Sequence, residues 1–421
     1  MANYNIREIA CDTLVEIMEH GQFSHIYIKQ VLDKYAYFEK NERSFITRLV
    51  NGTVERQIEL DYIINHYSKT KVKKMKPLIR TLLRMGVYEI YYMNAVPDSA
   101  TCNEYVKLAK KRGFSGLSGF VNGVLRSVVR GKVELAITDV STKYSMPQWI
   151  VDKWTADYGE KTCQDICEGF FMQQYLCVRV NTAKISKEEL VNRLESQGIK
   201  TEATDEVSTV LYISGYDNIA DIKEFKEGLF YIQDYSSQLA IQAVGITESA
   251  DVLDVCAAPG GKALHAASLT KGIVEARDLT EAKVALINEN IERAQANNIA
   301  AKVWDATVKD EDSIGKFDVV IADLPCSGLG IIRKKPDIKY NQSPESLAEL
   351  VELQKQILDT VCDYVKDDGI LSYSTCTINM DENERQALSF VERHPEFKIE
   401  RMEQLFPNGA HDGFFICILK K

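Results

Sequence analysis

Two cysteines stand where a sheet-based enzyme would present a nucleophile. Cys326 lies in the stretch Asp323–Gly328 (DLPCSG), and Cys376 follows the apolar run Gly369–Ser374. Each comes just after a predicted strand, so both thiols are expected at the carboxyl edge of one sheet. A thiolate there, near backbone N–H groups, can attack an electrophile. A lone cysteine would more often be a small buried side chain, and the residues alone do not decide which of the two attacks.

A candidate cofactor site lies further upstream, in the stretch Val252–Lys262 (VLDVCAAPGGK), which has the composition of a strand, a tight glycine turn and the start of a helix. Paired glycines let the backbone approach a ligand closely. Asp278 follows at about the twenty-residue spacing at which doubly wound folds place a carboxylate on ribose hydroxyls. A full G-x-G-x-x-G is absent, so we predict an adenosine-bearing cofactor other than a dinucleotide.

The elements that position these residues alternate as in a doubly wound α/β sheet. Four carboxylates fall at or near predicted strand ends, where such sheets bind ligands. They are Asp254, Asp278, Asp305 and Asp323. The predicted strands are 252–255, 272–276, 302–305, 318–323 and 369–374, with 397–406 and 413–419 closing the sheet. The predicted helices are 263–269, 280–297 and a long one that begins at Ser343-Pro344.

The first part of the chain has a different pattern. From Ile6 to about Arg130 the apolar residues recur at helical spacing, which predicts an all-α bundle. The stretch 131–160 is expected to be a linker that becomes helical around Trp149–Tyr158. A small α/β subdomain is expected next, with strands at 176–180, 210–213 and 228–232 and a helix at 186–197.

Charge is distributed unevenly along the chain. The formal net charge is −10, yet residues 1–132 hold 21 Lys+Arg against 13 Asp+Glu. Within 69–132 the balance is 14 basic to 3 acidic residues. A basic face for a polyanion explains this asymmetry, and so does a solvated helix surface that binds nothing.

Composition also limits the compartment. The ten cysteines are scattered, and the start of the chain lacks the apolar segment of a signal peptide. We therefore expect a reduced, cytoplasmic protein without a membrane span. No zinc-like cluster is evident, so no metal is expected.

The helical part resembles the NusB-like RNA-binding domain. Five segments carry this resemblance in order, namely Glu42–Phe45, Leu49–Thr53, Leu82–Glu89, Asn103–Val106 and Phe120–Arg126. The resemblance implies contact with RNA or a ribonucleoprotein.

Nearly the whole chain resembles the RsmB/Sun (Fmu) family of S-adenosylmethionine-dependent methyltransferases, which act on carbon 5 of cytosine in ribosomal RNA. The matching motifs are Asp254–Lys262, Asp278, Asp305, Asp323–Gly328, Arg333–Ile338, Ser374–Cys376 and Glu382-Asn383. The NusB-like front end marks the small-subunit rRNA branch. Thr377 stands where the family commonly has Ser.

The resemblance implies roles for individual residues. Cys376 would add to carbon 6 of the base, Cys326 would assist loss of the carbon 5 proton and release of the product, and Asp323 would bind the N3/N4 edge. Cofactor contacts are implied for Cys256, Ala257, Ala258, Pro259, Gly260, Gly261, Lys262, Asp278 (ribose), Asp305 (adenine) and Asp323. RNA contacts are expected for Arg333, Lys334, Lys335, Lys71, Lys73 and Lys74, although each is equally explained as a solvated charge.

The resulting prediction is a multidomain protein that methylates small-subunit (16S) rRNA as a monomer. We expect an all-α NusB-like domain over 1–132, a linker over 133–160, a small α/β RNA-binding subdomain over 161–235 and a Rossmann-like methyltransferase domain over 236–421. Three alternatives are a tRNA cytosine-C5 methyltransferase, a non-catalytic rRNA-binding assembly factor, and an exocyclic amino-group methyltransferase. The last usually has an Asp/Asn-Pro-Pro-aromatic loop and needs no thiol. The target base must leave its stack, so a single-stranded or loop site is expected.

Overall fold

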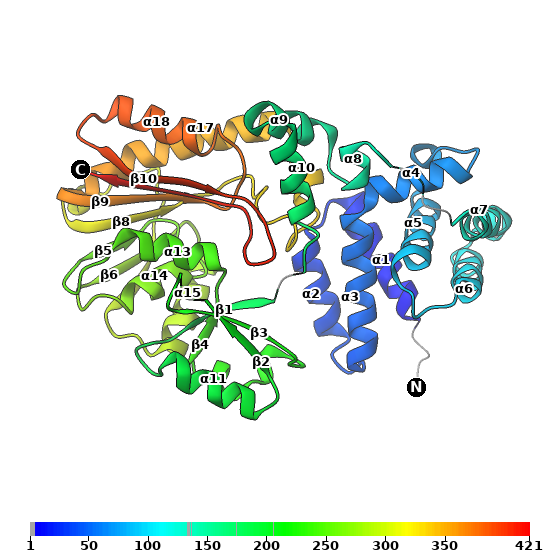
Figure 1. The fold of residues 1–421 in the computed structure, drawn as a ribbon, viewed down its shortest axis with the longest axis horizontal. Coiled ribbons are helices and arrows are strands. Elements are labelled where there is room, and N and C mark those ends of the chain that lie inside the picture. Colours follow the sequence, from blue (N-terminus) through cyan, green and yellow to red (C-terminus); the bar gives the residue numbers. More distant parts are fainter. Residues whose placement is uncertain (1–4, 133–134, 136, 174, 205) are drawn as a thin grey trace. The chain divides into compact units, whose positions relative to one another are not determined.

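The computed structural model describes residues 5–132, 135, 137–173, 175–204 and 206–421, so residues 133, 134 and 136 of the expected linker lie outside the described residues. The chain forms two compact units (Figure 1). One comprises Met1–Glu168 together with Ile332–Asn341, and the other comprises Gly169–Ile331 together with Gln342–Lys421.

The first unit consists of helices packed around α5 (Pro77–Tyr92), most of whose residues are buried. Pro77 occupies the first turn, where its missing N–H costs nothing. Gly52 lets α3 approach α5 closely, because a Cβ at this position would lie 2.0 Å from Cζ of Tyr88. The remaining helices are α1 (Ile6–His20), α2 (Ser24–Lys34), α3 (Lys40–Glu55), α4 (Gln57–Tyr67), α6 (Asp98–Lys111), α7 (Ser118–Arg130), α8 (Val140–Lys143), α9 (Gln148–Tyr158), α10 (Glu160–Gly169) and α16 (Ile338–Asn341).

A ten-residue segment from the far end of the sequence belongs to this helical unit. Asp337 is 4% exposed and accepts hydrogen bonds from the backbone N–H (3.2 Å) and the hydroxyl of Ser24. Lys339 is 1% exposed, and its Nζ donates to the carbonyl oxygen of Glu55 at 2.7 Å. Burying two charged side chains requires such partners, so the segment Ile332–Asn341 is anchored there.

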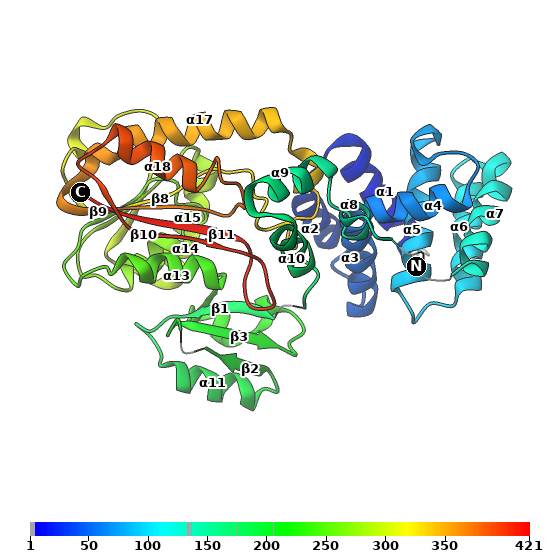
Figure 2. The ribbon, with the colours of Figure 1, turned by 45° about the horizontal axis from the view of Figure 1, so that its top comes forward.

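The second unit is built on a seven-stranded sheet of order β10-β11-β9-β8-β5-β6-β7. Its strands β8 to β11 are labelled in Figure 2. The five strands from β9 to β7 are parallel, whereas β11 runs antiparallel to both β9 and β10. The strands are β5 (Val252–Asp254), β6 (Val274–Asp278), β7 (Ile299–Val303), β8 (Phe317–Asp323), β9 (Val365–Thr375), β10 (Lys398–Leu405) and β11 (Phe414–Lys420).

Helices cover both faces of this sheet. Val252 packs with α13 (Tyr235–Val244), α14 (Gly261–Ala267) and α15 (Glu281–Ala294) in one apolar cluster. Its neighbour Leu253 packs with α17 (Pro344–Val361) and α18 (Glu384–Arg393) in another. Successive side chains of a strand point to opposite faces, so the adjacent apolar residues Val252 and Leu253 bury β5 on both sides.

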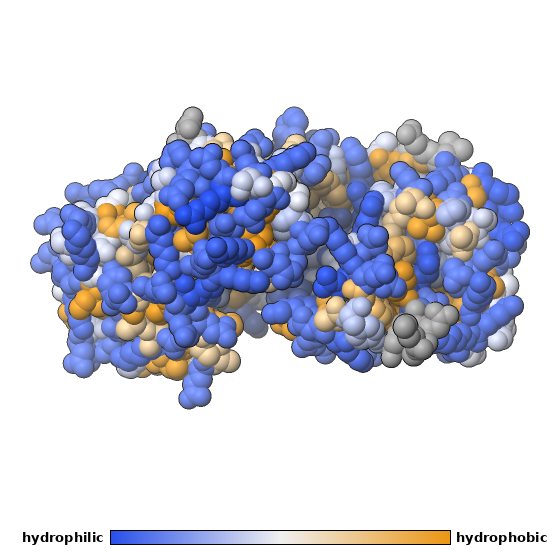
Figure 3. Space-filling model, turned by 90° about the horizontal axis from the view of Figure 1, so that it is seen from below, coloured by the Kyte–Doolittle hydropathy of each residue, from blue (hydrophilic) through white to orange (hydrophobic). Residues whose placement is uncertain are grey.

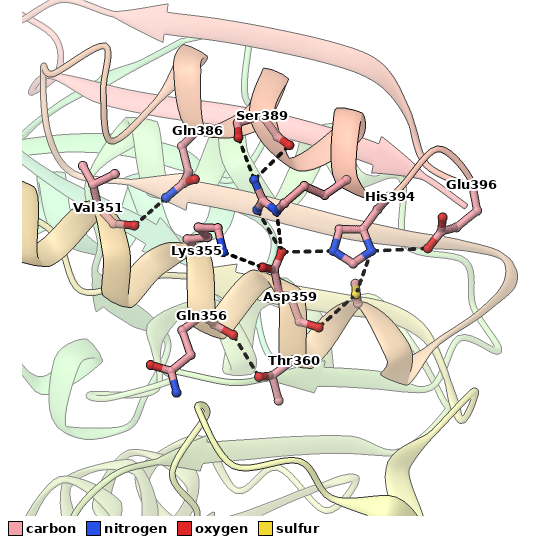
Figure 4. Close-up of polar contacts among 11 residues, drawn as sticks. Val351, Lys355, Gln356, Asp359, Thr360, Gln386, Ser389, His394 and Glu396 are labelled. Atoms are coloured by element: carbon pink, nitrogen blue, oxygen red, sulfur yellow. Dashed lines mark hydrogen bonds and ion pairs between the residues drawn. The ribbon is translucent and has the colours of Figure 1, made fainter.

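The helix pair on the second face is held by polar contacts (Figure 4). Asp359 of α17 accepts hydrogen bonds from Arg393 (2.8 Å) and Lys355 (3.2 Å), and it lies 3.0 Å from Nε2 of His394. Burial raises the pKa of Asp359, but the hydrogen bonds from these three side chains more than offset it and leave the pKa lowered. α17 and α18 are thereby fixed to one another.

A small antiparallel sheet precedes the large one in the same unit. Its order is β2-β3-β1-β4, from β1 (Leu176–Val180), β2 (Lys200–Ala203), β3 (Val210–Ser214) and β4 (Phe230–Ile232). α11 (Lys187–Ser196) shares its apolar core, and the single turn α12 (Lys223–Lys226) precedes β4. The side chain of Thr209 donates to Gln238 of α13 at 2.8 Å, which ties this sheet to the large one.

The visible surface is largely hydrophilic, with small scattered apolar patches (Figure 3). Among the described residues, every helix is too short or too polar to cross a lipid bilayer.

Candidate active site

The glycine turn after β5 packs its backbone closely against α15. Gly260 has a φ of +101°, in the region that favours glycine, and a Cβ there would lie 3.3 Å from Cγ2 of Ile287. The turn leads into α14, and the first N–H groups of this helix lack intrahelical partners. Backbone conformation and packing thus explain the glycine at position 260, and contact of the turn with a ligand remains a prediction.

Asp278 closes the next strand, β6, beside this turn. Its carboxylate accepts hydrogen bonds from the backbone N–H of Ala258 (2.9 Å) and of Leu279 (2.8 Å), and it pairs with Nζ of Lys283 at 2.9 Å. The side chain is nearly buried but borders a pocket. A carboxylate so oriented can accept further hydrogen bonds from a pair of hydroxyl groups.

The pocket has a volume of about 300 Å³. Its walls combine carboxylates with apolar and aromatic side chains, as small-molecule sites do. The lining includes Val255, Cys256, Ala258, Asp278, Leu279, Lys283, Trp304, Asp305, Asp323, Pro325, Cys326, Ile357 and Cys376. Apolar walls can pack against the adenine ring, and a near-buried carboxylate can accept hydrogen bonds from ribose hydroxyls. These residues therefore fit S-adenosylmethionine.

A charged pair lies at the reactive end of the pocket. Nζ of Lys262 donates to Oδ2 of Asp323 at 2.6 Å, and the hydroxyl of Ser374 donates to Oδ1 at 2.9 Å. Burial lowers the pKa of Lys262, but the Asp323 carboxylate more than offsets this, so the pKa of Lys262 is raised and the lysine stays charged. Burial, reinforced by the charge of Asp323, raises the pKa of Asp254 to about 7.

The two candidate thiols meet at this end. Sγ of Cys326 lies 3.4 Å from Sγ of Cys376, and both side chains are partly exposed. The hydrogen bond to Cys376, together with burial and nearby carboxylates, raises the pKa of Cys326 well above its usual range. Cys326 therefore holds its proton in the free protein. Its S–H group can donate a hydrogen bond to a thiolate on Cys376, which stabilises that thiolate.

Seven of the twelve predicted catalytic and cofactor-binding residues, Ala258 among them, line this pocket. Asp323, Cys326 and Cys376 line one pocket with Cys256 and Asp278. Asp305 also reaches this pocket, but it is exposed and binds the backbone and hydroxyl of Thr307. Its contact with adenine remains a prediction.

The remaining predicted residues lie elsewhere. Ala257, Pro259, Gly260, Gly261 and Lys262 form the turn and the start of α14 rather than the pocket wall. The three lysines at 71, 73 and 74 are exposed in the helical unit, where buried Val72 and Met75 hold their short 3₁₀ turn. Arg333, Lys334 and Lys335 belong to the segment anchored in that unit, and their RNA contacts remain a prediction.

Several residues of the pocket were not predicted. Lys283 neutralises Asp278, Leu279 and Trp304 form apolar walls, and Glu382 lies behind the Cys326 loop. Lys283 and Trp304 had a detectable signal in the sequence. Lys283 lies five residues after the predicted strand-end carboxylate Asp278, and Trp304 directly precedes Asp305. Among the described residues, no three His, Cys, Asp or Glu side chains are grouped as a metal site would require.

The parallel sheet, the glycine turn and the near-buried carboxylate at the end of β6 are features of an S-adenosylmethionine-dependent methyltransferase. Three family models match the chain in order: the NusB family over residues 4–130, the RsmF/B-like ferredoxin-like domain over 146–220, and the 16S rRNA methyltransferase RsmB/F over 241–420. The chain belongs to the RsmB family of ribosomal RNA small subunit methyltransferases. These matches confirm the family and the fold class predicted from the sequence.

Curated relatives resemble the chain from end to end. A probable ribosomal RNA small subunit methyltransferase B of Bacillus subtilis (strain 168) is 35% identical, with 100% of both chains covered. A protein of the same name from Synechocystis sp. is 31% identical, with 99% of both chains covered.

Solved structures share the fold. The crystal structure of PH0851 superposes with a TM-score of 0.83 and 24% identity, covering 100% of this chain and 99% of that one. NSun6 from Pyrococcus horikoshii, solved with SFG, gives a TM-score of 0.59 and 21% identity, covering 65% of this chain and 98% of that one.

Proposed function

We propose that the protein transfers a methyl group from S-adenosylmethionine to carbon 5 of a cytosine in small-subunit rRNA, through a covalent bond between Cys376 and carbon 6. The observation that carries this proposal is the pair of thiols 3.4 Å apart at the mouth of the cofactor pocket. Methylation of an exocyclic amino group would need no thiol there. The names of the curated relatives support rRNA of the small subunit as the substrate.

Carbon 5 of cytosine is a weak nucleophile, and a thiolate overcomes this. The electron pair of the Cys376 thiolate adds to carbon 6, which turns the ring into an enamine whose carbon 5 can accept the methyl group. The sulfonium cofactor supplies that methyl group and keeps the electron pair of the broken bond. Next, a base accepts the proton of carbon 5, and the electrons of that C–H bond re-form the double bond between carbons 5 and 6. In the same elimination the bond between Cys376 and carbon 6 breaks, and its electron pair returns to sulfur.

Three other side chains support these events in our proposal. Asp323 would receive the N3/N4 edge of the base, and the Lys262 ammonium beside it would stabilise charge that develops there. Cys326 would assist the loss of the proton and the release of the product. Its raised pKa favours Cys376 as the attacking group, since a protonated Cys326 is the poorer nucleophile.

RNA recognition is assigned to the basic residues. Lys71, Lys73 and Lys74 project from one exposed turn of the helical unit, and a basic cluster of this kind can hold phosphates. Arg333–Lys335 begin only seven residues after Cys326, so they would act on nucleotides that flank the target base. We propose that the chain works as a monomer in the cytoplasm, where its ten cysteines stay reduced.

Cys376→Ala tests the proposal. We expect loss of detectable 5-methylcytosine, measured by bisulfite sequencing of small-subunit rRNA treated with the variant, while S-adenosylmethionine still binds in calorimetry. Cys102→Ala is the matched control, since it removes a buried thiol from the helical unit and should leave methylation intact. Full activity of the Cys376 variant would refute the covalent mechanism.

The substrate is tested separately. Bisulfite sequencing of total RNA from cells with and without the gene should show one small-subunit cytosine that loses protection. A change confined to tRNA would assign the enzyme to tRNA instead. No change in any RNA would favour an assembly factor.

A further inference from the structure

The loop that carries Cys326 contains neither helix nor strand between residues 324 and 337. Cys376 is placed differently, because it directly follows β9, whose last residue Thr375 pairs with Phe415 of β11. A strand end has little freedom, whereas an irregular loop needs other contacts to hold a side chain within tenths of an ångström. The separation of the two thiols therefore depends on what fixes the Cys326 loop.

Backbone hydrogen bonds hold the flanks of the loop, such as that from the N–H of Gly330 to the carbonyl oxygen of Cys376 at 3.1 Å, and a single buried carboxylate holds the residues next to Cys326. Glu382 is fully buried in the turn between β9 and α18. It accepts hydrogen bonds from the backbone N–H of Ser327 at 2.9 Å and from the Ser327 hydroxyl. It also accepts from Nδ2 of Asn379 at 2.8 Å and from Nε2 of Gln354 at 3.0 Å. Four donors fill the acceptor sites of one carboxylate.

The same contacts clamp the backbone on both sides of Cys326. Nε2 of Gln354, besides reaching Glu382, donates to the carbonyl oxygen of Pro325 at 2.8 Å. The residue before Cys326 and the residue after it are thus both hydrogen-bonded to this network. The Ser327 hydroxyl lies a further 2.7 Å from that of Thr377, next to the second thiol.

No cation among the described residues comes within ion-pair distance of Glu382. A fully buried carboxylate without a cation is costly unless each oxygen is hydrogen-bonded, so the burial of Glu382 depends on the four donors described above, two of which belong to Ser327 beside Cys326. The elements that carry its partners are themselves fixed, because Asp359 ties α17, the source of Gln354, to α18, which starts two residues after Glu382 (Figure 4).

We infer that Glu382 is a positioning residue that sets Cys326 against Cys376 for the release step. This inference rests on the proposed function, in which Cys376 attacks the base and Cys326 assists release. In Glu382→Gln an NH₂ group, which cannot accept a hydrogen bond, would face two of the four donors. The network would therefore break, while the side-chain volume stays nearly constant. Cys376 would keep its strand register, whereas Cys326 would shift.

The expected consequence is selective for one step. In a single-turnover reaction with an RNA oligonucleotide and S-adenosylmethionine, Glu382→Gln should form the covalent protein–RNA adduct at a rate within about threefold of the parent. Resolution of that adduct into free methylated RNA should slow by about tenfold or more, so the adduct accumulates on denaturing gels. A purely structural defect would instead reduce both rates together.

Two further variants keep the result interpretable. Glu384→Gln makes the same change of charge two residues along and should behave like the parent. Ser327→Ala removes only the hydroxyl contacts and should slow adduct resolution by a smaller factor, even if Glu382→Gln fails to fold. Calorimetric binding of S-adenosylmethionine verifies the fold of each variant.

An unchanged adduct lifetime in a folded Glu382→Gln variant, or in Ser327→Ala if the former does not fold, would overturn the inference. The failure of the proposed function looks different, because the parent enzyme would then form no adduct that depends on Cys376.

Discussion

Lys339 gives the helical unit a stability that depends on pH in a defined direction. Burial lowers the pKa of Lys339 to about 7 from its ordinary value of 10.5, although the nearby Glu55 carboxylate opposes the shift. Arg56 and Cys167 are the other titratable groups that act on it. Between pH 7 and 10.5 the unfolded chain therefore binds more protons at this lysine than the folded chain does. The free energy of unfolding must rise with pH across that window and stay flat below it.

The magnitude follows from the shift. Each pH unit inside the window contributes at most about 1.4 kcal/mol, so between pH 7.5 and 9.5 the gain approaches about 2.7 kcal/mol. Lys339→Met replaces the ammonium with an apolar group of similar length and abolishes this titration. We expect the difference in unfolding free energy between parent and variant to change by about 2 kcal/mol over the same two pH units.

The assay is urea unfolding followed by tryptophan fluorescence at pH 7.5, 8.5 and 9.5. The chain has three tryptophans, and in a Trp304→Phe background the reporters Trp149 and Trp154 both lie in α9 of the helical unit. Subtracting the unfolding free energy of the variant from that of the parent cancels the contributions of groups that titrate alike in both proteins. Lys29→Met removes an exposed lysine and should follow the parent curve. A difference in unfolding free energy between parent and variant that stays constant within about 0.5 kcal/mol from about pH 7.5 to 9.5 would refute a neutral Lys339 in the folded protein.

Two further predictions concern ligands. Asp278→Asn removes the charge of the near-buried pocket carboxylate. Calorimetry should then show that the Kd for S-adenosylmethionine rises by about ten- to a hundredfold. Glu281→Gln changes an exposed carboxylate nearby and should leave this Kd unchanged. A change below about threefold would contradict the ribose contact. Replacing the lysines at 71, 73 and 74 by Gln should reduce the slope of log affinity for rRNA against log salt concentration by up to about 2, measured by filter binding. An unaltered slope would assign RNA binding to another surface.

The sequence predicted the methyltransferase sheet well because its signals are local. β5 is a short apolar run beside a glycine turn, and α17 begins with Ser343 as cap and Pro344 in its first turn. β2 escaped prediction, because Lys200–Ala203 is polar and lies at a sheet edge, where little apolar pattern is required. β7 ends at Val303 rather than at the predicted Asp305, since strand ends leave little trace in composition.

The site was predictable as residue types but not as contacts. Strand-end carboxylates and thiols could be placed at one edge of the sheet by topology alone. The pairing of Lys262 with Asp323 could not, because it joins residues 61 positions apart through side-chain geometry. The pair Glu382-Asn383 was part of the family resemblance without an assigned role, and only the fold shows that Glu382 is buried behind the Cys326 loop.

The anchored segment explains why the chain cannot be treated as a series of independent modules. Residues 332–341 belong to the compact helical unit although they follow the Cys326 loop directly in sequence. A chain cut before Gly169 would deprive Asp337 and Lys339 of their partners Ser24 and Glu55, leaving two normally buried ionisable side chains without these hydrogen bonds. The segment would then lose its fixed conformation, and with it one end of the loop that must hold Cys326. Removing the helical domain should therefore loosen the loop that carries Cys326 as well as remove the exposed lysines at 71, 73 and 74.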